Sequence, residues 1–270
     1  MTIGLSTYSF FWQWHEPTNP APLGLTAMVA KTAELGCDLL QVCDYPPLER
    51  YDAAAVTDLR AACTRHGVRL ELGTRGLDPD HLHRYLALAE TLEATLVRSM
   101  IRAEEADRAE ELLREALPAY EQADVSIALE TYEQVPISRM MAVIEAIDSP
   151  HLGVALDPAN CVAALQTPAS TIAATAPRVL NLHVKDFAFT RQAGWVGFTY
   201  AGARLGEGLL DYPAMISAVQ PEQRGINQIV EHWLVWQGDS ATTCALEDDW
   251  TRHNLHYLRA FTPTERTDPR

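Results

Sequence analysis

The segment Leu152–Asp157 reads LGVALD, a short and almost uninterrupted apolar run that ends in an acidic residue. Two other segments, Val125–Thr131 (VSIALET) and Val179–Val184 (VLNLHV), have the same character. Strands with one face in water alternate apolar and polar residues, whereas continuous apolar runs are typical of parallel strands covered on both faces. The three segments therefore predict parallel strands inside an α/β protein.

Further runs extend this pattern over the whole chain, at residues 2–8, 38–44, 68–74, 95–99 and 226–231. Most runs begin 27 to 36 residues after the one before, which is the length of one strand followed by one helix. Between the runs, apolar residues recur with helical spacing, as at Leu82, Tyr85, Leu86 and Ala89. Eight such units predict a single-domain (β/α)8 TIM barrel over residues 1–262, with a polar C-terminal tail at 263–270.

A doubly wound open sheet is the alternative architecture, and it usually carries a glycine-rich phosphate loop after its first strand. Residues 9–14 read SFFWQW and contain no glycine, so the barrel is preferred. Helix ends are also visible in the sequence. Asp80 is expected to cap the third helix after Pro79, and Gly36 and Gly67 are expected to follow the first two helices.

The composition limits the classes of partner. The chain has 21 Lys and Arg against 36 Asp and Glu, a net charge of −15, which argues against a nucleic-acid substrate. No apolar stretch approaches the roughly 20 residues that span a bilayer, so no membrane partner is expected. The five cysteines form no CxxC pair, which indicates reduced thiols and a cytoplasmic location.

Two segments between predicted strands are long and rich in aromatic residues, residues 9–24 and 186–208. Active sites of this fold lie at the C-terminal ends of the strands, where such segments line or cover them. Trp12 and Trp195 are therefore candidates for stacking on a sugar. The alternative is that these aromatic residues bury against a second subunit, in a homodimer or a higher homo-oligomer.

Polar side chains end four consecutive predicted strands, namely Glu130, Asp157, His183 and Glu231. Each alone has an ordinary structural explanation, such as a helix cap or a hydrogen-bonded core histidine. Three carboxylates at one barrel mouth would repel one another unless a cation lay among them. We therefore expect one divalent metal ion at this site, Mn²⁺ or Mg²⁺ first and Co²⁺ or Zn²⁺ as alternatives.

These four residues resemble the metal-binding set of the xylose isomerase-like TIM barrels, a superfamily of sugar isomerases, epimerases, inosose dehydratases and endonuclease IV. The segments His183–Asp186 and Leu205–Gly208 support the similarity to its sugar phosphate isomerase/epimerase group, also described as AP endonuclease family 2-like. The resemblance covers nearly the whole chain. It implies that Glu130 and Glu231 also act as acid and base on either side of a ketose, through a metal-stabilised enediolate. Lys185 could stabilise a developing oxyanion, or pair with Asp186 or Glu207.

The sequence departs from the family pattern at Asn160, where many relatives carry the histidine of a DxxH motif. The early strands also lack the extra histidines with which endonuclease IV-like members hold three zinc ions, so one metal and a non-nucleic-acid substrate are expected. Asn160 and the nearby Glu133 remain candidate substrate contacts.

Arg75 and Arg98 follow or end the third and fourth predicted strands, and Arg204 lies in the second long segment. Arginine binds carboxylates and phosphates in a bidentate manner, so these residues suggest an anionic sugar. They could instead balance the carboxylates of the metal site. The first hypothesis is a metal-dependent sugar or sugar-acid isomerase/epimerase. The alternative is a lyase on the same site, either a decarboxylase of a 3-oxo sugar acid or a dehydratase. A non-enzymatic sugar-binding barrel and an endonuclease IV-like nuclease are less expected.

Overall fold

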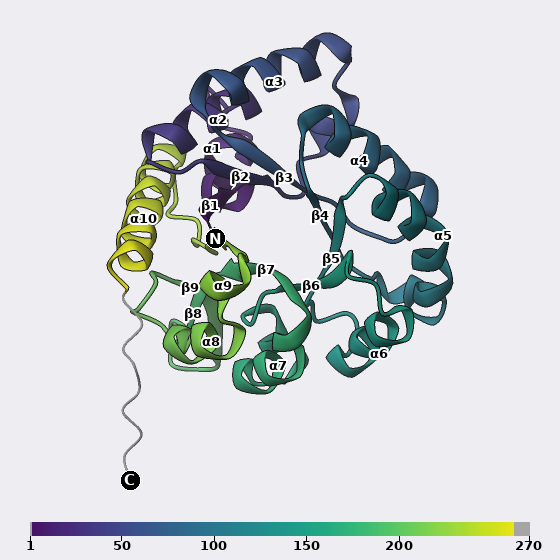
Figure 1. Ribbon diagram of the computed structural model, residues 1–270. Helices are drawn as coiled ribbons and strands as arrows, with labels where there is room; N and C mark the ends of the chain where they lie inside the picture. The colour runs from purple at the N-terminus through teal and green to yellow at the C-terminus, as the bar shows by residue number, and fades with distance from the viewer. Residues whose placement is uncertain (1, 262–270) are drawn as a thin grey trace.

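Every predicted apolar run forms a parallel strand, and the strands close into a barrel (Figure 1). The computed structural model describes residues 2–261, so the tail predicted at 263–270 lies outside the described residues. Around the barrel the order is β1, β10, β7, β6, β5, β4, β3 and β2, which confirms the (β/α)8 fold. In chain order the barrel strands are β1 (Ile3–Ser6), β2 (Leu39–Val42), β3 (Arg69–Gly73), β4 (Leu96–Ser99), β5 (Ser126–Glu130), β6 (Leu152–Leu156), β7 (Val179–Val184) and β10 (Asn227–Val230).

Helices surround the strands as an outer layer (Figure 1). The predicted apolar face of the third large helix is buried against the barrel at Leu82, Tyr85, Leu86 and Ala89. The helices are α1 (Phe11–His15), α2 (Leu25–Glu34), α3 (Ala53–His66), α4 (Pro79–Leu92), α5 (Ala109–Gln122), α6 (Ile137–Ile147), α7 (Pro168–Thr175), α8 (Tyr212–Val219), α9 (Pro221–Arg224) and α10 (Ser240–Ala260). Short 3₁₀ helices span Thr7–Phe10, Pro46–Arg50, Ala103–Arg108, Asn160–Ala164 and Ala176–Arg178.

Most helix ends follow the sequence signals, with one correction. Gly36 and Gly67 follow α2 and α3 with φ of +73° and +66°, the left-handed backbone that glycine adopts without strain. The cap of α4 is Asp78 and not the predicted Asp80. The side chain of Asp78 accepts a hydrogen bond of 2.9 Å from the amide of His81, and Pro79 occupies the first turn. The capping residue therefore lies one position before the proline rather than one position after it.

The second long segment, residues 186–208, contains a β-hairpin. Strands β8 (Asp186–Arg191) and β9 (Phe198–Ala203) pair in an antiparallel manner beside α8 (Figure 1). The hairpin lies against the chain that follows β10, because the amide of Gly202 donates a 3.2 Å hydrogen bond to the carbonyl of Trp233. A Cβ at Gly202 would lie 2.7 Å from that carbonyl oxygen, so only glycine permits this approach.

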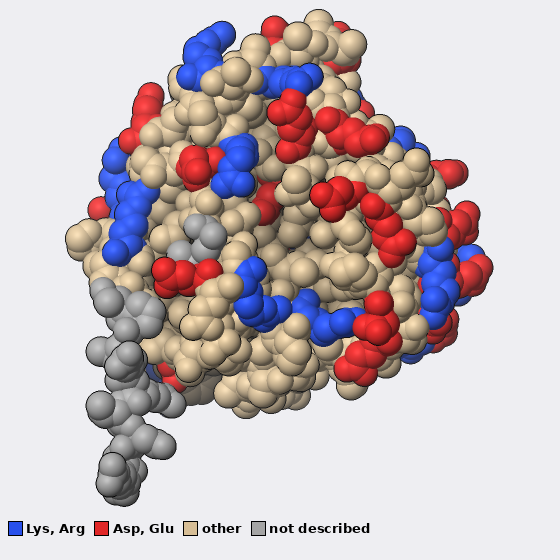
Figure 2. All heavy atoms as spheres, in the orientation of Figure 1, with Lys and Arg blue, Asp and Glu red and all other residues tan. Residues whose placement is uncertain are grey.

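Charged side chains of both signs lie around the rim of the face shown in Figure 2, with uncharged residues between them.

Within residues 2–261, none of the helices combines the length and the apolar character needed to cross a bilayer.

Candidate active site

The four polar strand ends converge on one buried point at the C-terminal end of the barrel. Glu130 ends β5, Asp157 follows β6, His183 lies near the end of β7 and Glu231 follows β10. The Nδ1 atom of His183 lies 3.8 Å from Glu130 Oε1, 3.9 Å from Asp157 Oδ2 and 3.6 Å from Glu231 Oε1. All four residues are at most 4% exposed. The structure therefore brings together the complete set that the sequence singled out.

A hydrogen bond at Nε2 orients the imidazole of His183 so that Nδ1 faces these carboxylates. Its Nε2 atom lies 2.7 Å from the side-chain oxygen of Gln41. An amide oxygen only accepts hydrogen bonds, so Nε2 carries a hydrogen and Nδ1 faces the three acids. Among the described residues, Nδ1 is buried without a hydrogen-bond partner. An unpartnered ring nitrogen among carboxylate oxygens is a donor set that fits a divalent cation.

Lys185 lies among the same acids. Its Nζ atom is 2.6 Å from Asp157 Oδ2 and 3.2 Å from Glu231 Oε2, and it lies 4.1 Å from the centre of the Trp233 ring. Burial alone would lower the pKa of Lys185, but the carboxylates of Asp157 and Glu231 outweigh burial and raise that pKa. The side chain is therefore a protonated ammonium group, with protons available for transfer.

Glu130 is held differently from Glu231. Its Oε2 atom forms an ion pair with the guanidinium of Arg98, and its Oε1 atom accepts a 2.7 Å hydrogen bond from the amide of Asn160. Burial opposes ionisation, but Arg98, followed by His183 and Lys185, lowers the pKa of Glu130 well below its ordinary value. Glu130 is thus a fixed anion with both oxygens engaged.

Asp44 is a site residue to which the sequence reading gave no role. It follows β2 with φ of +47°, and it accepts hydrogen bonds from Tyr8 (2.9 Å) and Arg75 (2.8 Å). Its other oxygen lies 3.2 Å from Arg98. Burial alone would raise the pKa of Asp44, but Arg98 and then Arg75 outweigh burial and lower that pKa. The only sequence signal was its position at the end of a predicted strand, as for the four residues above.

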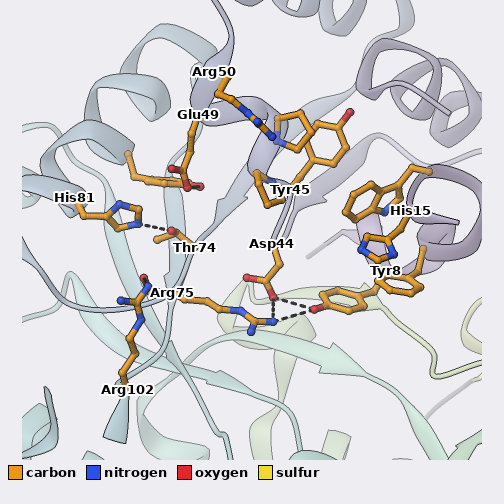
Figure 3. Close-up of a pocket in the computed structure, with 15 residues that line it drawn as sticks. Tyr8, His15, Asp44, Tyr45, Glu49, Arg50, Thr74, Arg75, His81 and Arg102 are labelled. Atoms are coloured by element: carbon orange, nitrogen blue, oxygen red, sulfur yellow. Dashed lines mark hydrogen bonds and ion pairs between the residues drawn. The ribbon is translucent and has the colours of Figure 1, made fainter. Parts of the chain in front are cut away.

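A cavity of about 570 Å³ opens beside these residues, over the ends of β1 to β3 (Figure 3). The arginines in its lining outnumber the acids, with Arg50, Arg75 and Arg102 against Asp44 and Glu49. Arg75 extends across the cavity toward Asp44 and Tyr8 in Figure 3. A locally cationic cavity in a chain of net charge −15 is suited to a small anion.

A second pocket, of about 340 Å³, shares Tyr8 and Phe11 with the first but is mostly apolar. Trp12, Tyr200 and Trp233 line it, and the Trp12 indole donates a 2.8 Å hydrogen bond to the carbonyl of Leu234. Trp12 therefore lines a pocket whose wall includes Trp233, and its stacking on a sugar stays a prediction. Trp233 connects this pocket to the acidic cluster, because Lys185 Nζ lies 4.1 Å from the centre of its ring.

Other predicted substrate contacts are not brought to this cluster. Trp195 lies in the turn of the β8–β9 hairpin and is 79% exposed. Arg204 follows β9 and forms an ion pair with Asp249 of α10. Glu133 is half-buried beyond the end of β5 and lines neither of the two pockets above.

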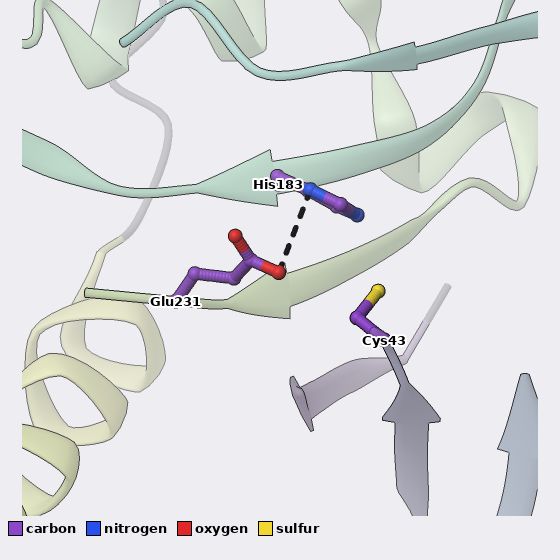
Figure 4. A group of neighbouring side chains, drawn as sticks. All are labelled: Cys43, His183 and Glu231. Atoms are coloured by element: carbon purple, nitrogen blue, oxygen red, sulfur yellow. Dashed lines mark ion pairs between the residues drawn. The ribbon is translucent and has the colours of Figure 1, made fainter. Parts of the chain in front are cut away.

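Cys43 lies next to His183 and Glu231, at the end of β2 (Figure 4). Its Sγ atom lies 2.9 Å from the Gln41 side-chain oxygen, to which the thiol donates. Burial raises the pKa of Cys43 well above its ordinary value. Arg98 lowers that pKa and Glu231 raises it, but burial is the larger effect. Burial therefore favours the neutral thiol, which donates its hydrogen to Gln41.

A closed barrel of eight βα units with acids and an imidazole at its mouth defines the class. The chain belongs to the xylose isomerase-like TIM barrel family, whose model matches residues 29–261. It is 52% identical over 267 residues to the 3-oxo-isoapionate decarboxylase of Pectobacterium atrosepticum, an alignment that covers 97% of each chain. The likeness to a full-length enzyme identifies the chain as an enzyme.

Solved structures show the same fold at low sequence identity. D-psicose 3-epimerase, crystallised with D-fructose, has a TM-score of 0.73 at 14% identity, over 98% of this chain and all of that one. A xylose isomerase-like protein from Mycobacterium smegmatis, in complex with magnesium, has a TM-score of 0.70 at 18% identity, over 96% of this chain and 98% of that one.

Proposed function

We propose that this enzyme is a divalent-metal-dependent lyase that decarboxylates a 3-oxo sugar acid. The full-length relative named as a decarboxylase supports this reading over the isomerase/epimerase hypothesis. The class of substrate, a small sugar derivative, is common to both. The location in the cytoplasm and the association of subunits remain predictions.

The observation that carries the proposal is the unequal state of the two glutamates. A two-base epimerase needs an acid/base group on each face of its substrate. Glu130 is poorly suited to that role, because Arg98 and Asn160 engage both of its oxygens. Proton transfer is left to Glu231 and its neighbour Lys185. A decarboxylase needs only one proton donor, which matches a site with one proton-transferring side.

The charges of the site favour an anionic substrate. The three carboxylates of Glu130, Asp157 and Glu231 face two buried cations, Arg98 and Lys185, which leaves one net negative charge. A divalent cation would change this to one net positive charge. A site with a single positive charge is electrostatically complementary to a monocarboxylate.

The residues present fit the metal that the family resemblance implies. Glu130, Asp157, His183 and Glu231 would hold it, and their oxygen-rich set with one imidazole suits Mn²⁺ or Mg²⁺. When bound, the cation would supply Lewis-acid stabilisation of negative charge on neighbouring substrate oxygens.

The side chains can account for the remaining chemistry. The arginines of the cationic cavity would bind and orient the acidic substrate. Loss of CO₂ leaves the electron pair of the broken C–C bond on the adjacent carbon, delocalised into the 3-oxo group. Lys185 would then donate a proton to that carbon, and Glu231, which accepts a hydrogen bond from Lys185, would help to return a proton from solvent. Because Lys185 is an ammonium, it lacks the lone pair that an amine nucleophile needs.

The test is CO₂ release from 3-oxo sugar acids, with D-psicose and D-fructose as parallel substrates. Enzyme stripped with a chelator should be inactive, and added Mn²⁺ or Mg²⁺ should restore CO₂ release. The ketoses should not interconvert. Epimerisation of the ketoses, with no CO₂ from any 3-oxo sugar acid, would reject the proposal in favour of the first hypothesis.

A further inference from the structure

A buried hydrogen-bond network lies inside the barrel beneath the acidic cluster, and it contributes no residue to the metal site itself. It joins Gln41 of β2, Glu71 of β3, Asn181 of β7 and Asn227 of β10. Strand register places Gln41 opposite Glu71 and Asn227 opposite Asn181. Gln41, Glu71 and Asn181 are at most 3% exposed. A carboxylate kept inside a barrel needs a reason, because burial of an ion without hydrogen bonds is costly.

Glu71 organises the network as an acceptor. Its Oε2 atom accepts hydrogen bonds from Gln41 and Asn181, each of 2.9 Å, and its Oε1 atom accepts one of 2.8 Å from Asn227. The amide nitrogen of Gln41 also lies 3.1 Å from Oδ1 of Asn181, a second acceptor. Both contacts require the nitrogen of the Gln41 amide on this side. The Gln41 oxygen must therefore point the other way, toward His183.

The direction of the Gln41 amide determines the state of His183. The amide oxygen lies 2.7 Å from His183 Nε2 and also accepts from the Cys43 thiol. It can accept a hydrogen bond from Nε2 but cannot donate one. The neutral ring must therefore carry its hydrogen on Nε2 and present the lone pair of Nδ1 to the carboxylates.

We infer that Gln41, oriented by Glu71, is a positioning residue that selects the His183 tautomer and so sets the metal affinity of the site. This inference rests on the proposed role of His183 as a ligand. Partners of this kind raise the basicity of a ligating imidazole and hold its ring plane, and their loss typically weakens metal binding about 10–100-fold.

The test compares Mn²⁺ affinity, measured by calorimetry, in Gln41→Leu and in a matched control. Leucine is of similar size but accepts no hydrogen bond, so the dissociation constant should rise roughly 10–100-fold. Gln228→Leu is the control. Gln228 is also a buried strand residue, but its oxygen accepts a 2.8 Å hydrogen bond from Tyr212 of α8, on the outside of the barrel. Its substitution should leave the Mn²⁺ affinity unchanged.

A measurement on the unmodified protein does not depend on how the variants fold. In metal-free protein with ¹⁵N-labelled histidine, at a pH above the pKa of the ring, the His183 spectrum should show the Nε2–H tautomer. The opposite tautomer would overturn the inference. Unchanged Mn²⁺ affinity in Gln41→Leu, combined with lost affinity in His183→Ala, would also overturn it without contradicting the metal site. Unchanged affinity in His183→Ala as well would reject the metal assignment itself.

Discussion

Lys185→Met is expected to lower kcat for CO₂ release by about 10²–10⁴-fold, the usual contribution of a positioned general acid. Methionine keeps much of the length of the side chain but has no proton to deliver to the carbon that loses CO₂. Affinity for Mn²⁺ should be retained or increased, because the ammonium at 2.6 Å from Asp157 and 3.2 Å from Glu231 repels a second cation. Steady-state CO₂ release and Mn²⁺ calorimetry measure the two effects separately.

The chain contains only one other lysine, Lys31, which provides the control. Lys31 pairs with Asp248 of α10, away from the acidic cluster, so Lys31→Met should leave kcat unchanged. A Lys185→Met enzyme with normal kcat would exclude Lys185 as the proton donor. A variant that lost both turnover and Mn²⁺ binding would indicate a structural role instead.

Arg98→Met is expected to reduce the free energy of unfolding by about 3–5 kcal/mol, the cost of removing one partner from a buried ion pair. Arg98 is 3% exposed and compensates two carboxylates, those of Glu130 and Asp44. Its loss would leave both acids buried with weaker compensation. Urea denaturation of the metal-free protein measures the effect, and saturating Mn²⁺ should recover part of the loss because it restores positive charge beside Glu130.

Arg75→Met is the matched control, since Arg75 contacts the same Asp44 but has a side chain that is 46% exposed. Exposed ion pairs contribute roughly 0–1 kcal/mol, so this variant should be nearly as stable as the parent. Equal stability of Arg98→Met and the parent protein would contradict the view that Arg98 fixes Glu130 as an anion.

The barrel and the acidic cluster were predictable because their signals are local. A continuous apolar run predicts a buried parallel strand, and the polar residue that follows the run marks the C-terminal end of that strand. Since all strand ends of a closed parallel barrel meet at one mouth, Glu130, Asp157, His183 and Glu231 could be brought together without coordinates. Asn160, three residues after Asp157, could be included for the same reason.

The rest depends on contacts that no local pattern encodes. Gln41 and Glu71 interrupt apolar runs, and only strand register reveals that they face each other inside the barrel. The position of Arg98 on its strand could not show whether the guanidinium binds a substrate or a neighbouring carboxylate. That depends on the direction of the side chain, which turns toward Glu130 and Asp44. The aromatic residues of the second long segment suggested a lining for the site, but pairing of β8 with β9 turns Trp195 out into solvent.

In the proposed reaction, only one side of the site transfers a proton after CO₂ has left. NMR of the product formed from a 3-oxo sugar acid in D₂O with Mn²⁺ measures this. We predict one deuterium in a single configuration at the carbon that lost CO₂, and no second epimer on prolonged incubation. Deuterium in both configurations, or ketose epimers formed without loss of CO₂, would contradict the account and indicate a two-base epimerase.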